Sequence, residues 1–297
     1  MSGVIESPAS LARRRLHKIE DDTDGDGQLE AANGTTSKTE QQQPDEGSII
    51  ENKEAAIDQS TPTDDEPRNA LAWLAPVFHL TMTVFYTLLL YYGITLLQGD
   101  NVKLIDPKGK IPAYGGRFKF LTHINQWVQL FVFAFLFITD MIPRSSFKKI
   151  MTKLSDIAFT AVAFPLSWFI VITFWAIYAY DRQLVYPISF DKVVPSWLNH
   201  FWHTTIGVFV LFEVMLVYHR YPKSGMAACL SLIVNAAYLS WIGWVYGQTK
   251  FWAYPIMAVL PIPFLVLFIA GCMLFSFCLF FFGRHVSTLR WGPTSAY

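Results

Sequence analysis

The chain has little charge and few cysteines for its length. Only 15% of its 297 residues are charged, whereas 53% are hydrophobic and 16% are aromatic. Soluble domains usually carry about 25% charged residues, so this composition indicates an integral membrane protein. The net charge of zero hides a division, because residues 1 to 68 hold 16 of the 23 acidic residues and only 7 of the 23 basic ones.

Carboxylates are therefore scarce after residue 68, where 7 acidic and 16 basic residues remain. Of these acids, only Asp140, Asp156 and Glu213 lie in or at the ends of apolar segments. This scarcity argues against an aspartyl protease and against a di-metal carboxylate site. The three cysteines all fall inside apolar segments, so neither a disulfide framework nor a zinc cluster is implied.

Residues 1 to 68 contain few large apolar residues and lack the short apolar core of a signal peptide. Their content of Asp, Glu, Ser, Thr, Gln and Gly is typical of a disordered tail. The run Asp22-Thr-Asp24-Gly-Asp26-Gly27 resembles the first half of an EF-hand loop, but the twelfth position is Asn33 instead of the required glutamate. We predict a disordered acidic tail over 1–68, without a calcium site, and a membrane domain over 69–290.

Six apolar segments follow, each close to the ~20 residues that a bilayer-crossing helix needs. We predict an all-α fold, a six-helix transmembrane bundle, in the endoplasmic reticulum or the plasma membrane. Pro165 is expected to kink the third helix, as membrane helices tolerate. No internal repeat is present, which disfavours an inverted-repeat transporter. The segments run over 70–97, 120–141, 156–180, 200–218, 226–247 and 258–282.

A polar stripe interrupts the start of the second segment. Thr122, Asn125, Gln126 and Gln129 are spaced i, i+3, i+4, i+7, which places them on one helical face. Polar side chains at membrane depth cost free energy unless they face a protein interior or a wet cavity. We therefore expect this face to line the interior of the bundle.

The fourth segment begins with a second polar group, Asn199, His200, His203 and Thr204. Helices two and four enter the membrane from the same side, because one full crossing and return separates their starts. Thr122 and His203 each lie a few residues inside those starts, so they share a depth and a leaflet. Two residues about 80 positions apart can thus meet.

A threonine and a histidine that meet can catalyse acyl transfer. The threonine hydroxyl needs a base to become a nucleophile, and histidine, with a pKa near ~6.5, is the usual base. The pair would attack a carbonyl to give an acyl-enzyme and then pass the proton to the leaving alcohol. The candidate oxyanion donors are the free amides at the start of helix two, the amides of Gly115 and Gly116, and the side chains of Asn125 and Asn199.

Such a site would open near the membrane interface, where an amphipathic ester can enter from the lipid. Arg117, Lys119 and Arg182 lie on the adjoining loops and could hold an anionic head group. Glu213 is ten residues past His203, roughly 15 Å along a helix, so a structural hydrogen bond is its expected use.

Other interpretations compete with this one. A lone threonine near a helix start is usually a cap or a backbone-bonded residue. The His200-x-x-His203 pair lacks the spacing and glutamate of a zincin, and the seven histidines do not form the boxes of a membrane di-iron desaturase. We predict no metal and no cofactor.

Four runs of the sequence resemble one family of multi-pass membrane proteins, the androgen-induced protein and androgen-dependent TFPI-regulating protein family. The likeness covers approximately residues 75 to 285, and its most specific parts are the third helix and the Asn-His-x-x-His-Thr-Thr run. The runs are Tyr114-Gly-Gly-Arg-Phe-Lys-Phe-Leu-Thr122, Ala163-Phe-Pro165, Phe174-Trp-Ala-Ile-Tyr-Ala-Tyr-Asp181-Arg182 and Trp197-Leu-Asn-His200-Phe-Trp-His203-Thr-Thr205.

The resemblance implies a six-helix membrane threonine hydrolase that cleaves fatty acid esters of hydroxy fatty acids. In that family the nucleophile closes the Gly-Gly run, which here is Thr122, and the base is the second histidine of the Asn-His-x-x-His run, here His203. The expected partners are a lipid ester substrate and the bilayer, with no nucleic acid and no protein partner that the sequence identifies. The alternative is a non-catalytic membrane scaffold or signalling protein.

Overall fold

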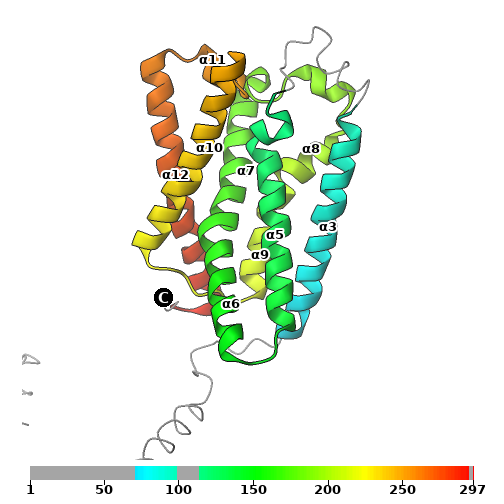
Figure 1. The fold of residues 1–297 in the computed structure, drawn as a ribbon, viewed down its shortest axis with the longest axis vertical. Helices are drawn as coiled ribbons and strands as arrows, with labels where there is room; N and C mark the ends of the chain where they lie inside the picture. Colours follow the sequence, from blue (N-terminus) through cyan, green and yellow to red (C-terminus); the bar gives the residue numbers. More distant parts are fainter. Residues whose placement is uncertain (1–70, 99–113, 294–296) are drawn as a thin grey trace, which may run out of the picture. The chain divides into compact units, whose positions relative to one another are not determined.

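The protein is a bundle of helices in a computed structural model that describes residues 71–98, 114–293 and 297 (Figure 1). The tail over 1–68, with its EF-hand-like run, lies outside these residues. The described ranges contain helices and no strand, so the predicted all-α fold class is confirmed. The α-helices are α3 (Ala75–Leu96), α5 (Leu121–Met141), α6 (Ser146–Ala158), α7 (Phe164–Asp181), α8 (Ser196–His203), α9 (Thr205–Leu216), α10 (Ser224–Thr249), α11 (Pro255–Val259) and α12 (Ile262–Trp291).

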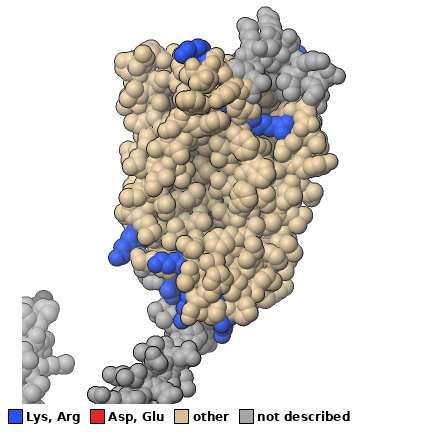
Figure 2. All heavy atoms as spheres, viewed as in Figure 1, with Lys and Arg blue, Asp and Glu red and all other residues tan. Residues whose placement is uncertain are grey.

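Within the described ranges, five helical stretches are long and apolar enough to cross a membrane, and α9 is a shorter apolar helix. Their outer faces carry large exposed apolar side chains, such as Val84 and Leu88 on α3 and Leu267 and Leu274 on α12. Figure 2 shows one face on which Lys and Arg side chains lie toward the two ends and uncharged residues fill the middle. This distribution suits contact with lipid tails between two polar interfaces. The protein is a multi-pass integral membrane protein.

The third span begins ten residues earlier than the predicted residue 156, because α6 starts at Ser146. Ser145 caps this helix by accepting a hydrogen bond of 3.1 Å from the amide of Lys148. Exposed lysines made this stretch resemble a loop in the sequence. One turn of π-helix, η3 (Phe159–Ala163), joins α6 to α7 just before Pro165. The kink expected at Pro165 stays a prediction.

The fourth span is divided, whereas the sequence predicted one helix over 200–218. α8 ends at His203 and α9 begins at Thr205, with Thr204 between them at φ −124° and ψ −55°. The indole nitrogen of Trp175 donates to the carbonyl of His203 at 3.1 Å and to the hydroxyl of Thr204 at 3.0 Å. Trp175 therefore satisfies polar groups that the break removes from regular helical bonding.

A buried ionic network closes the end of the bundle away from the start of α5. Glu213 accepts hydrogen bonds from Nε2 of His79 at 3.0 Å and from Nε2 of His219 at 2.9 Å. The other ring nitrogen of His79 lies 2.7 Å from Asp140, and that of His219 lies 2.9 Å from Asp156. An ionised carboxylate can only accept, so each imidazole donates from both nitrogens and carries a positive charge.

His219 lies beyond the end of α9, and its environment favours this charge. Burial lowers its pKa, but the hydrogen bonds to Asp156 and Glu213 outweigh burial and raise the pKa to about 9. The structural hydrogen bond predicted for Glu213 is thus present. Sequence spacing does not indicate this network, because 134 positions separate His79 from Glu213.

Candidate functional site

A tight turn before α5 places the candidate nucleophile. Gly115 and Gly116 have φ values of 79° and 52°, and two successive left-handed residues favour glycine strongly. A Cβ on Gly115 would also lie 3.1 Å from Val245 of α10. The turn leads into the short 3-10 helix η2 (Gly116–Lys119), after which α5 begins with Leu121 and Thr122.

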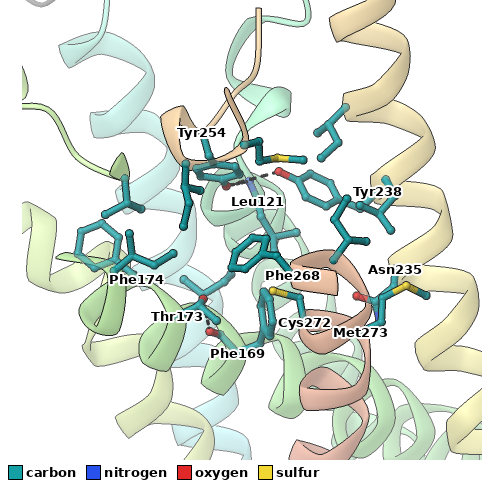
Figure 3. A pocket seen from close by; sticks show the side chains of 18 of the residues that line it. Leu121, Phe169, Thr173, Phe174, Asn235, Tyr238, Tyr254, Phe268, Cys272 and Met273 are labelled. Carbon is teal, nitrogen blue, oxygen red and sulfur yellow. Dashed lines mark hydrogen bonds between the residues drawn. The ribbon is translucent and has the colours of Figure 1, made fainter. Parts of the chain in front are cut away.

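Side chains of α10 and of the segment before α11 hold this entrance in place. The hydroxyl of Tyr254 accepts a 2.8 Å hydrogen bond from the amide of Leu121, so it caps α5 (Figure 3). Tyr238 donates its hydroxyl to the carbonyl of Lys119 at 3.0 Å, and Trp241 donates to the carbonyl of Phe118 at 2.9 Å. Sequence reasoning missed these positioning residues; the i, i+3 spacing of Tyr238 and Trp241 on α10 was the available signal.

Thr122 and His203 meet, with 3.2 Å between the Thr122 hydroxyl oxygen and His203 Nε2. On the other side of the ring, Nδ1 lies 3.0 Å from the main-chain oxygen of Asn199 and 2.8 Å from its side-chain oxygen. Both oxygens are acceptors, so Nδ1 carries the proton and neutral His203 presents a lone pair on Nε2 to the threonine hydroxyl. The geometry is that of a hydroxyl nucleophile, its base and a group that orients the base.

The imidazole of His203 is held rigidly. It is 6% exposed, and the ring of Phe174 stacks on it with 3.5 Å between centroids and 8° between planes. Thr122 itself is half-buried. His200, one turn before His203, is exposed and stacks on Trp175.

The polar stripe of α5 faces the bundle interior, as predicted. Asn125, Gln126 and Gln129 are all less than 5% exposed. The amide nitrogen of Gln129 donates to Asn125, to the carbonyl of Ala163 and to the hydroxyl of Ser167. Through Gln129, the stripe therefore joins α5 to the π-helical turn η3 and to α7 by hydrogen bonds.

Two cavities of about 130 Å³ each meet at Thr122. The first, which we call the α12 cavity, lies among α7, α10, α11 and α12, and Phe169, Asn235, Phe268 and Cys272 are among its walls (Figure 3). The second, the α8 cavity, lies among α3, η2, α5 and α8, and its walls include Arg117, His123, Tyr186, Trp202 and His203. Phe174 and Tyr254 border both cavities.

Of the cationic residues proposed from the sequence, Arg117 lines the α8 cavity, whereas Lys119 and Arg182 line neither cavity. The candidate oxyanion donors Asn125, Asn199, Gly115 and Gly116 also line neither cavity. The side-chain oxygen of Asn199 accepts a hydrogen bond from His203 Nδ1, and that of Asn125 accepts one from Gln129. The side-chain oxygens of both asparagines therefore have a protein partner. Gly115 and Gly116 form the turn before η2. Arg182 forms an ion pair of 2.7 Å with Asp191. Their oxyanion and substrate roles stay predictions.

Comparisons with known proteins agree with the sequence resemblance. Residues 74–288 match the family model of the FAR-17a/AIG1-like protein. The androgen-dependent TFPI-regulating proteins of Mesocricetus auratus and Homo sapiens are each 34% identical to this chain, over 73% of it and 93% of their own length. The human androgen-induced gene 1 protein is 34% identical over 60% of this chain and 79% of its own. No solved structure is significantly similar. The chain therefore belongs to the FAR-17a/AIG1-like protein family.

Proposed function

We propose that the protein is a membrane-embedded carboxylic ester hydrolase that cleaves fatty acid esters of hydroxy fatty acids. Thr122 is the nucleophile and His203 is the base. The observation that carries this proposal is the 3.2 Å contact between the threonine hydroxyl and Nε2, together with the two acceptors that hold the proton on Nδ1. A lone capping threonine would not require a histidine oriented in this way.

The first half of the reaction forms an acyl-enzyme. His203 Nε2 takes the hydroxyl proton as the Thr122 oxygen attacks the ester carbonyl carbon. When the tetrahedral intermediate collapses, the ester C–O bond breaks and the alkoxide of the hydroxy fatty acid receives that proton from Nε2. In the second half, a water gives a proton to Nε2 as its oxygen attacks the acyl carbon. When this second intermediate collapses, the bond between the acyl carbon and the Thr122 oxygen breaks, Nε2 returns the proton to that oxygen, and the fatty acid leaves.

The oxyanion of each tetrahedral intermediate needs a hydrogen-bond donor close to the nucleophile. The first four amides of a helix have no carbonyl of their own helix to bond. In α5, the amide of Leu121 bonds Tyr254, and the amides of His123 and Ile124 bond the carbonyl of Phe120. The fourth is the amide of Thr122, which we assign as the oxyanion donor.

The two cavities match a substrate with a chain on each side of the scissile bond. Because both reach Thr122, an ester group placed there can direct its acyl chain into one cavity and its alcohol half into the other. The walls are mainly apolar, which suits fatty chains.

A second candidate is a non-catalytic membrane scaffold that acts through protein partners. This candidate is favoured by the relatives named androgen-dependent TFPI-regulating proteins, because that name describes regulation of another protein. Retention of a cellular effect by an inactive Thr122→Ala protein would support this candidate, whereas loss of the effect would support the enzyme.

Labelling with a serine- and threonine-directed fluorophosphonate tests the proposed nucleophile. Wild-type membranes should label at the mass of this chain, and Thr122→Ala and His203→Ala membranes of equal expression should not. Thr139→Ala is the matched control, since Thr139 lies at the other end of α5 and its hydroxyl donates to the carbonyl of Phe135 in the same helix. Equal labelling of the Thr122→Ala protein would contradict the assignment.

A further inference from the structure

Arg117 lies in the wall of the α8 cavity, which also contains Thr122 and His203. Its Nη2 donates to the carbonyls of Ile94 at 2.6 Å and Leu97 at 2.7 Å, at the end of α3. A guanidinium has five N–H groups, and three of them belong to Nε and Nη1. The anchored side chain can therefore offer further donors to a ligand.

The charge of Arg117 has no carboxylate partner within 4.0 Å among the residues that the structure describes. Arg182, by contrast, pairs with Asp191 at 2.7 Å. Burial lowers the pKa of Arg117, because partial removal from water disfavours a charge that no counter-ion balances. An anion in the cavity would relieve this penalty.

Two further donors line the same cavity. Trp202 and Tyr186 are 9% and 6% exposed, and within the described ranges the Trp202 indole nitrogen and the Tyr186 hydroxyl have no hydrogen-bond partner. Buried donors normally have an acceptor, so a ligand that brings acceptor oxygens would satisfy them. The far wall of the α12 cavity, in contrast, is formed largely by apolar side chains such as Phe169, Phe268 and Met273 (Figure 3).

We propose that Arg117 binds the free carboxylate of the ester substrate. The hydroxy fatty acid half then occupies the α8 cavity, and the acyl chain occupies the α12 cavity. This assignment rests on the proposed function of Thr122 and His203. Arginine suits the role because its planar fork can bind a carboxylate through two parallel hydrogen bonds.

Arg117 also caps the carbonyls at the end of α3, where a positive charge is favourable. If capping were its whole role, losing the side chain would impair every substrate equally. A carboxylate-binding role predicts that the loss depends on the charge of the substrate. The two roles can therefore be distinguished by the ratio of activity on a charged substrate to activity on an uncharged one.

The test compares one ester that has a free carboxylate with the methyl ester of the same compound. Wild type, Arg117→Gln, Arg117→Lys and the control Lys250→Gln would be assayed in membranes at matched expression. Lys250 lines neither cavity. For Arg117→Gln, kcat/KM on the free acid should fall about 10- to 100-fold, mainly through KM. This fall equals about 1.4–2.8 kcal/mol, close to what a hydrogen bond to a charged group contributes. Turnover of the methyl ester by Arg117→Gln should change less than about threefold, and Arg117→Lys should be intermediate.

The outcomes separate the two proposals. Suppose that wild type cleaves both esters. If Arg117→Gln then lowers kcat/KM by the same factor on both esters, or lowers it on neither, the carboxylate assignment is overturned while the hydrolase stands. If wild type cleaves neither ester, the proposed function fails and the carboxylate assignment fails with it.

Discussion

Asn199→Ala should reduce turnover only modestly, because His203 Nδ1 has two acceptors. The variant removes the side-chain oxygen at 2.8 Å but keeps the main-chain oxygen of the same residue at 3.0 Å. The remaining carbonyl still holds the proton on Nδ1, so Nε2 still faces Thr122 as an acceptor. Losing one neutral hydrogen bond costs about 0.5–1.5 kcal/mol, which corresponds to roughly a 2- to 13-fold fall in rate.

This expectation differs sharply from the behaviour of triads in which one side chain alone orients the histidine. There, replacing the aspartate by asparagine forces the wrong tautomer and lowers kcat by about 10⁴-fold. The assay is initial-rate hydrolysis of the fatty acid ester by purified protein in detergent, with His203→Ala as the negative control that gives the background rate. A fall beyond about 1000-fold would refute the idea that the Asn199 main chain fixes the tautomer. An unchanged rate and pH profile would show that the Asn199 side chain does not act on His203.

Three further predictions concern stability and are measured as thermal unfolding midpoints in detergent. Glu213→Ala should lower the free energy of unfolding by about 3–5 kcal/mol, since it leaves two buried charged imidazoles without their shared partner; an unchanged midpoint would contradict the network. Because the pKa of His219 is raised from 6.5 to about 9, its stabilisation is complete below pH 6.5 and is lost as the pH rises through about 9. The midpoint should fall across that window, and His219→Gln should flatten the decline; an equal decline in both proteins would reject this source. Gly283→Ala should destabilise by about 1–3 kcal/mol, because its Cβ would lie 2.7 Å from the ring of Phe164. Gly271→Ala on the same helix meets nothing within 4 Å and is the control, so equal midpoints for the two variants would count against the packing argument.

Local periodicity made the main architecture and the central pair predictable from the sequence. The spacing of Thr122, Asn125 and Gln129 depends only on helical geometry, and these three residues do lie along the inner side of α5. The shared depth of Thr122 and His203 follows from the parity of membrane crossings. Neither inference requires knowledge of how distant helices pack.

Features that depend on contacts between distant segments could not be predicted. The capping of α5 by Tyr254 joins residues 133 positions apart, and Glu213 joins His79 across 134. The break at Thr204 lacks proline or glycine, the usual sequence signals, and is stabilised by Trp175 from another helix. The two cavities likewise arise from packing among several helices, which residue spacing along one chain does not specify.

The most direct test of the Thr122–His203 pair as a catalytic unit is hydrolysis of a fatty acid ester of a hydroxy fatty acid. The assay uses membranes that express wild type, Thr122→Ala, Thr122→Ser or His203→Ala at matched levels. We expect turnover by wild type, measurable turnover by Thr122→Ser because it keeps a hydroxyl beside His203 Nε2, and background rates for the two alanine variants. An inert wild type, or a Thr122→Ala protein that keeps its turnover, would contradict this expectation.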